Sequence, residues 1–83
     1  MFKPKTFSLK FNGRSGITYK ESGRRMLIDS EMLDGKTFDM VIYRDSIKCW
    51  QPPHDDEPVS EEKRRDIEDN IRMDLRRYRV DWQ

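Results

Sequence analysis

His54, Asp55 and Asp56 place an imidazole beside two carboxylates, the groups from which metal sites and general-base pairs are built. A metal site needs three or four converging ligands, and the chain holds one histidine and one cysteine. Consecutive acidic residues in a loop bounded by prolines usually serve to keep that loop solvated. We therefore expect neither a metal site nor acid–base catalysis at this position.

Cys49 is a second candidate for chemistry, as a nucleophile with His54 as its base. A reactive thiolate needs an electropositive and partly exposed setting. Cys49 instead alternates with Ile47 on an expected strand and precedes an acidic loop, so we expect a buried, unreactive thiol. The chain also lacks a G-x-S-x-G elbow and a glycine-rich segment that could cradle phosphate. We therefore expect no enzyme activity, no catalytic residues and no cofactor.

The composition describes a small folded chain with a densely charged surface. Of its 83 residues, 34% are apolar and 40% are charged, but the apolar residues fall into periodic runs, which indicates one folded domain over residues 1–83. The net charge of +1 hides an asymmetry, because residues 1–25 carry +6, residues 26–59 carry −5 and residues 60–83 are neutral. Such a chain either pairs its own halves or displays one basic and one acidic face.

The compartment is inferred from what the chain lacks. One cysteine cannot form an intramolecular disulfide, and small domains of oxidising compartments usually depend on such links. The N-terminal residues alternate lysine with apolar residues, unlike a secretory signal, and no apolar run approaches the roughly 20 residues that span a bilayer. We therefore expect a cytoplasmic protein with no membrane partner.

The first half of the chain has the two-residue period of strands. Tight-turn pairs separate its apolar runs, and both sides of TFDMVIYRD carry bulky residues, which favours a central strand there. Short strands joined by tight turns are antiparallel. We expect a meander of four or five strands within residues 1–50, at KTFSLKF, ITYKE, RRMLID, TFDMVIYRD and IKCW.

The second half changes to a helical period after a Pro-rich acidic loop at residues 51–59. Ser60 is a suitable N-cap, and the spacing of four apolar residues predicts one long helix over residues 60–79. This stripe consists of Ile67, Ile71, Leu75 and Tyr78. The economical fold is an α+β domain, a small antiparallel sheet with the C-terminal helix packed on one face. We expect Trp82 either to pack beside Tyr78 or to lie in a frayed end.

The basic N-terminal third could bind nucleic acid, since Phe7, Phe11 and Tyr19 are interleaved among its cations. Strand alternation, however, places these aromatic rings and the lysines on opposite faces. The expected helix also carries six acidic residues, which would repel phosphate. A nucleic-acid-binding accessory protein is therefore the alternative hypothesis, and a homodimer formed through a sheet edge or the helix is a third.

The Pro-rich loop is the best candidate for a binding surface. Pro52 and Pro53 restrict the backbone, so neighbouring side chains are held with little entropy left to lose. Rigid aromatic anchors beside charges are typical of protein interfaces. Trp50 suits equally a role in capping the core, whereas the acidity around His54 fills no obvious structural need. The candidate partner-binding residues are Trp50, His54, Asp55, Asp56 and Glu57.

The segment SEMLDGKTFDMVIYRDSIKCWQPPHDDEPVSEEKRRDIEDNI, residues 30–71, resembles the immunity protein 74 family of bacterial polymorphic toxin systems. The block IYRDSIKCWQPP is its most specific part, while Ser30 stands where the family pattern has glycine. The resemblance implies a small α+β cytoplasmic protein, encoded beside a toxin, that binds the toxin and neutralises it. By analogy with other immunity proteins, the acidic residues of the loop would cover a basic site on that toxin.

Overall fold

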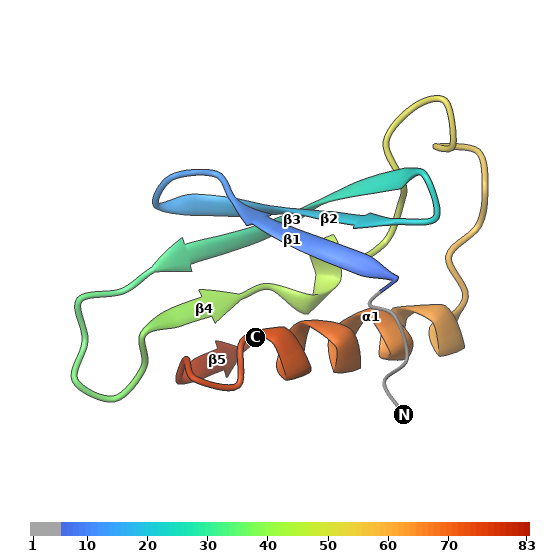
Figure 1. Ribbon diagram of the computed structural model, residues 1–83. Coiled ribbons are helices and arrows are strands. Elements are labelled where there is room, and N and C mark those ends of the chain that lie inside the picture. Colours follow the sequence, from blue (N-terminus) through green and yellow to red (C-terminus); the bar gives the residue numbers. More distant parts are fainter. Residues whose placement is uncertain (1–5) are drawn as a thin grey trace.

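The computed structural model describes residues 6–83 as an α+β fold with a five-stranded sheet, as the sequence predicts (Figure 1). The strands lie in chain order, and the first three pairings are antiparallel whereas β4 and β5 are parallel. The strands are β1 (Phe7–Phe11), β2 (Ser15–Glu21), β3 (Arg24–Met32), β4 (Met40–Ile42) and β5 (Val80–Trp82). A short 3-10 helix, η1 (Arg44–Ser46), follows β4, and the helix α1 (Glu61–Asp74) precedes β5.

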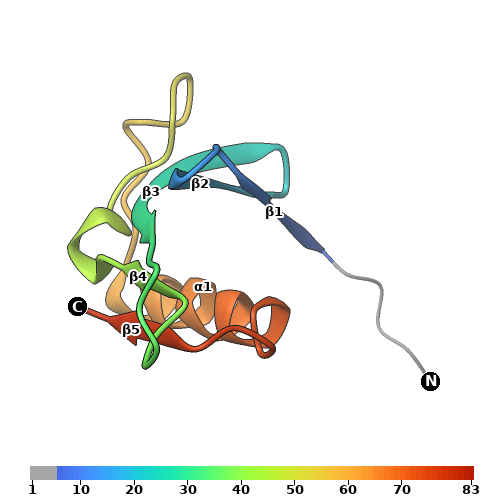
Figure 2. The same cartoon turned by 90° about the vertical axis from the view of Figure 1, so that its left-hand side faces the viewer.

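The sheet curls around its own core. In Figure 2, β1, β2 and β3 form the upper layer, β4 and β5 descend at one side, and α1 lies below the upper layer. The side chains between sheet and helix are buried, and α1 contributes Ile67 and Ile71 as its fully buried positions. Within residues 6–83, the helix is neither long nor apolar enough to cross a membrane. The helix thus covers the inner face of the sheet, as expected.

The fifth strand is not the one predicted. IKCW does not pair back onto the sheet, because η1 reverses the chain and the Ser46 hydroxyl closes this turn, donating to the Tyr43 carbonyl at 2.6 Å. Ile47 is still buried, but Cys49 is exposed, so the expectation of a buried thiol was wrong. The position beside β4 is filled by Val80–Trp82, and their parallel direction follows from the crossover through α1.

Trp82 therefore neither frays nor packs beside Tyr78. It pairs with Ile42 in the sheet register, and the guanidinium of Arg72 lies 4.5 Å from the centre of its ring. Asp39 fixes the entry into β5, because its carboxylate accepts hydrogen bonds from the Arg79 backbone at 2.8 Å and from the Arg79 side chain at 2.9 Å. The hydrogen bonds from Arg79 lower the pKa of Asp39.

The helix is shorter than predicted, because the residues after it form β5. It ends at Asp74 instead of residue 79, since the chain must be extended again by Val80 to enter the sheet. Tyr78, predicted to belong to the buried stripe, is 39% exposed and contacts Phe11 with ring centres 5.7 Å apart. The N-terminal end agrees with the prediction, as the Ser60 hydroxyl accepts from the Lys63 backbone at 3.0 Å.

A polar link centred on Tyr19 joins the sheet to the helix. The Tyr19 ring is fully buried, and its hydroxyl donates to the Glu21 carboxylate and accepts from the Asn70 amide at 2.9 Å. Lys63 of α1 forms an ion pair with the other oxygen of Glu21. Burial opposes ionisation of Glu21, but the hydrogen bonds from Lys63 and Tyr19 outweigh it and lower its pKa. Burial and the bond to Glu21 raise the pKa of Tyr19.

Loss of the Tyr19 hydroxyl should destabilise the fold without creating a cavity in the core. We expect Tyr19→Phe to lower the free energy of unfolding by about 1–2 kcal/mol, because the Asn70 amide and Glu21 each lose a partner in a part-buried setting. Urea unfolding measures this change. Tyr43→Phe is the matched control, since Tyr43 is 36% exposed; an equal loss in both variants would contradict the role of the link.

The hairpin between β2 and β3 depends on two residues with positive φ. Glu21 pairs with Arg24, so Ser22 and Gly23 form a two-residue loop, and their φ values are 52° and 76°. This is the conformation of a type I′ turn, whose twist matches that of the flanking strands. The turn sets the register that brings Arg24 and Arg25 to the start of β3.

Gly23→Ala should therefore lower the free energy of unfolding by about 1 kcal/mol, because a Cβ is strained at positive φ even where space is open. Gly35→Ala is the control, since a Cβ there would meet the Phe38 carbonyl at an ordinary 3.6 Å and its φ lies outside the left-handed region. Thermal or urea unfolding compares the two variants. A neutral Gly23→Ala would show that the turn does not need this conformation.

Candidate partner-binding surface

The loop after Trp50 is anchored to the core at its first residues. Trp50 is only 4% exposed, and its ring stacks on Tyr19 with centres 6.4 Å apart. The Gln51 backbone N–H then donates to the Arg25 carbonyl at 2.7 Å, which ties the loop to the start of β3. Pro52 and Pro53 follow directly and limit the backbone further. Trp50 therefore serves as an anchor, and little of its surface remains for a partner.

Glu57 anchors the loop at its other end. Its carboxylate receives two hydrogen bonds from one guanidinium, from Arg24 Nε at 3.0 Å and from Arg24 Nη2 at 2.7 Å. These bonds lower the pKa of Glu57 and raise that of Arg24. His54 Nε2 lies 4.0 Å from the same carboxylate, and the Glu57 N–H donates to the His54 carbonyl at 3.0 Å. Both ends of the loop are thus fixed to the β2–β3 hairpin.

The tip between these anchors carries two unpaired carboxylates. Asp55 and Asp56 are exposed, and neither forms a hydrogen bond or ion pair with any part of residues 6–83. Figure 1 shows the loop projecting beyond the turn between β2 and β3, away from the body of the sheet. The loop then leads into the start of α1, where Glu61 and Glu62 are also exposed. The tip is therefore a negatively charged projection held on a rigid base.

The five candidate residues thus divide into two groups. Trp50 and Glu57 hold the loop in place, with half-buried His54 beside Glu57, while Asp55 and Asp56 form the exposed tip. Cys49 is exposed next to this loop as a free cysteine. Among the described residues, no group of three or more His, Cys, Asp or Glu side chains could hold a metal ion.

Sequence reasoning did not identify Arg24 as part of this arrangement. Arg24 and Glu57 lie 33 positions apart, and no local pattern links them. The available signal was the opposite charge of residues 1–25 and residues 26–59, which allows the two parts to pair. Arg24–Glu57 is such a pair, so part of the positive charge of residues 1–25 is neutralised by an acidic residue of the same protein.

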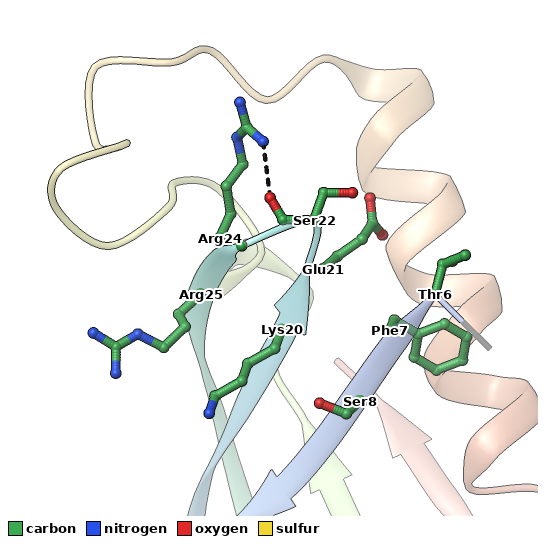
Figure 3. A pocket seen from close by; sticks show the side chains of 9 residues that line it. Thr6, Phe7, Ser8, Lys20, Glu21, Ser22, Arg24 and Arg25 are labelled. Atoms are coloured by element: carbon green, nitrogen blue, oxygen red, sulfur yellow. Dashed lines mark hydrogen bonds between the residues drawn. The ribbon is translucent and has the colours of Figure 1, made fainter. Parts of the chain in front are cut away.

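Three other basic residues, Lys10, Lys20 and Arg25, lie on the outer face of the sheet, which is turned away from α1, whereas Arg14 lies in the turn between β1 and β2. This outer face consists of Ser8, Lys10, Thr18, Lys20, Arg25, Leu27, Asp29 and Glu31. An open hollow of about 630 Å³ lies where β1 and β3 begin and β2 ends. Figure 3 shows Lys20, Arg25 and Ser8 among the side chains that line it. Tyr19 is buried on the inner face and Phe11 packs on Tyr78, so these rings are not interleaved with the cations.

Comparison with known proteins identifies one family. The family model described as Immunity protein 74 matches residues 9–81, nearly the whole chain. No curated protein and no solved structure matches the chain. The match includes most of β1 and all of β2, which lie outside residues 30–71, the segment that carries the resemblance in the sequence.

The tether between Arg24 and Glu57 predicts a measurable titration. In Arg24→Met the pKa of Glu57 should rise toward its ordinary value of 4.5, because the two hydrogen bonds that lower it are lost. A carboxyl whose pKa is lowered on folding stabilises the fold above its unfolded pKa. That stabilisation is lost as the pH falls below about 4.5 toward the folded pKa.

Side-chain carboxyl NMR measures the titration of Glu57 in the wild type and in Arg24→Met, with Arg25→Met as the control. Arg25 neighbours Arg24 in the chain but forms no hydrogen bond with Glu57. An unchanged Glu57 titration in Arg24→Met would mean that the loop is not held by this pair in solution.

Proposed function

Because the chain belongs to the immunity protein 74 family, we propose that it binds a bacterial toxin and neutralises it by protein–protein contact, without catalysis. The observation that carries the choice of surface is the acidic tip formed by Asp55 and Asp56, whose carboxylates are charged, exposed and unpaired within the described chain. The proposal places the protein in the cytoplasm of the cell that produces the toxin.

The physical argument begins with preorganisation. A loop that is already ordered pays little conformational entropy when a partner binds it. The base of this loop is fixed by the Trp50–Tyr19 stack, the Gln51–Arg25 hydrogen bond and the two bonds of the Arg24–Glu57 pair. The tip can therefore meet a partner in the conformation that it already has.

Charge supplies the second part of the argument. Asp55 and Asp56 have no cation of the described chain to neutralise them, so their field extends into solvent. Complementary charge across an interface accelerates encounter and selects partners more than it adds affinity. A toxin that acts on an anionic substrate, such as a nucleic acid, carries a basic site, and an acidic projection fits such a site.

The alternative of nucleic-acid binding receives less support. Stacking of bases requires exposed aromatic rings beside the cations. Tyr19 lies in the core and Phe11 packs against Tyr78, while the cations Lys10, Lys20 and Arg25 lie on the outer face. No specific observation favours nucleic acid over a protein partner, so we do not adopt this function.

The first test is a tagged pull-down from the native cells at high salt. We expect one stoichiometric protein to remain bound, and its gene to be lethal when expressed alone and harmless when coexpressed with this chain. Recovery of nucleic acid that washes off as salt rises would instead support the alternative, because phosphate contacts release counterions.

The acidic tip is then tested by charge reversal. We expect Asp55→Lys with Asp56→Lys to slow association with the captured toxin roughly tenfold at low salt, because both steering charges are reversed. Stopped-flow or surface-based kinetics at several salt concentrations measure this rate. The fold should be unaffected, since neither side chain has a partner among residues 6–83.

The control has the same change in net charge elsewhere. Asp34→Lys with Asp69→Lys reverses two exposed carboxylates, whose side chains are 91% and 74% exposed and lie outside the loop. If both double variants slow association equally, net charge alone is responsible. If neither does, the toxin is not steered by this loop.

A further inference from the structure

The outer face of the sheet carries a feature that toxin binding through the loop does not use. Figure 2 shows α1 on the other side of the sheet, so the helix does not cover this face. Leu27, in the middle of the longest strand, is 52% exposed there. A single exposed leucine is normal on a protein surface, so the charges around Leu27 carry the argument.

Two cations on this face lie directly opposite each other. Lys20 of β2 pairs in register with Arg25 of β3, and no residue of the described chain forms an ion pair with either. Like charges at opposite positions of an antiparallel pair are destabilising. Within residues 6–83 nothing offsets this repulsion, so a source of negative charge outside the protomer would stabilise it.

The charges along β3 suggest what that source is. Arg25, Leu27 and Asp29 follow one another on the outer face at two-residue steps, each about 6.7 Å long, and Glu31 follows beyond a β-bulge opposite Ser15–Ile17. A cation thus lies one step before Leu27 and an acid lies one step after it. Neither Asp29 nor Glu31 forms a side-chain ion pair with another described residue.

This order is complementary to itself. Consider two copies whose outer faces meet. If the two-fold axis that relates them lies between the sheets, perpendicular to the strands and level with Leu27, the two β3 strands face each other and run antiparallel. This arrangement brings Arg25 over Asp29 of the second copy and Leu27 over its own equivalent. Glu31 of the second copy then lies near the β2–β3 turn, beside Lys20. Each of these charges on β2 and β3 meets an opposite one, and every such contact occurs twice, as in an isologous interface.

We propose that the outer face of β1, β2 and β3 is the interface of a symmetric homodimer. The second copy supplies the two carboxylates that Lys20 and Arg25 lack within their own protomer, and it covers the exposed surface of Leu27. An acidic segment of an unrelated protein would meet the cations but would leave Asp29 and Glu31 facing acids. A second copy supplies opposite charges both to the cations and to the acidic residues of this face.

The size of the face sets the strength of the dimer. Strands of five, seven and nine residues give a face of at most about 30 Å by about 14 Å, or no more than about 400 Å² per protomer. The total falls below the roughly 1,200–2,000 Å² of stable complexes. Lys10 lies in the row of Leu27 and meets its own copy at the rim, where solvent screens the two charges. The dimer is therefore weak, concentration-dependent and sensitive to salt.

Sedimentation velocity of the purified chain, from micromolar to near-millimolar concentration, tests this proposal without the toxin. We expect the mass to rise from monomer to dimer with concentration, and less steeply at high salt. Arg25→Glu and Asp29→Lys should each weaken dimerisation roughly tenfold, because each replaces reciprocal attractive pairs by repulsive ones. Leu27→Lys should weaken it as well.

The double variant Arg25→Glu with Asp29→Lys gives the decisive result. A symmetric interface restores both pairs with their signs exchanged, so the double variant should dimerise like the wild type. Arg76→Glu, an exposed cation beyond α1, is the control and should leave dimerisation unchanged. Circular dichroism confirms that every variant is folded.

Two outcomes overturn the proposal. One is a wild-type chain that stays monomeric at near-millimolar concentration and low salt. The other is a dimer whose affinity the single substitutions leave unchanged, or one that both single substitutions weaken and the double variant does not restore. Both are independent of toxin binding, because residues 54–56 lie outside the outer face. A monomeric protein could still neutralise a toxin through its loop.

Discussion

The buried side chain of Tyr19 is the contact on which the rest of the structure depends. Its ring stacks on Phe7 of β1 and on Trp50 at the base of the loop, and its hydroxyl binds Glu21 and Asn70. One residue thus touches the first strand, the helix and the start of the acidic loop. In a chain with only 34% apolar residues, such shared contacts replace a large core. The position of the loop follows from the same side chain that holds the helix.

The sequence predicted best where the signal is local. Two-residue alternation placed Phe7–Phe11 and the strands around Tyr19 and Met26, and the serine cap placed the start of α1. The α+β class followed from these elements. Each depends on neighbours within a few positions, so their patterns survive in a single sequence.

The misassigned elements depend on distant partners. Val80–Trp82 is too short to show a strand pattern, and it pairs with residues 40 positions earlier in the chain. IKCW does alternate, but the 3-10 turn before it directs the chain away from the sheet and leaves Cys49 exposed. Its two adjacent prolines, the preceding tryptophan and its acidity marked the loop as a candidate site. Its division into anchors and tip depends on the Arg24–Glu57 pair, which only the folded chain brings together.

The parallel pairing of β4 with β5 has a consequence for synthesis of the protein. Met40, Val41 and Ile42 are all buried, yet the strand that completes the sheet beside them ends at Trp82. A nascent chain therefore leaves an apolar sheet edge open until this last strand emerges from the ribosome. Chains with such non-local pairings fold slowly, and their open edges are prone to association. The pairing of β5 with β4 can therefore form only after residue 82 has been translated.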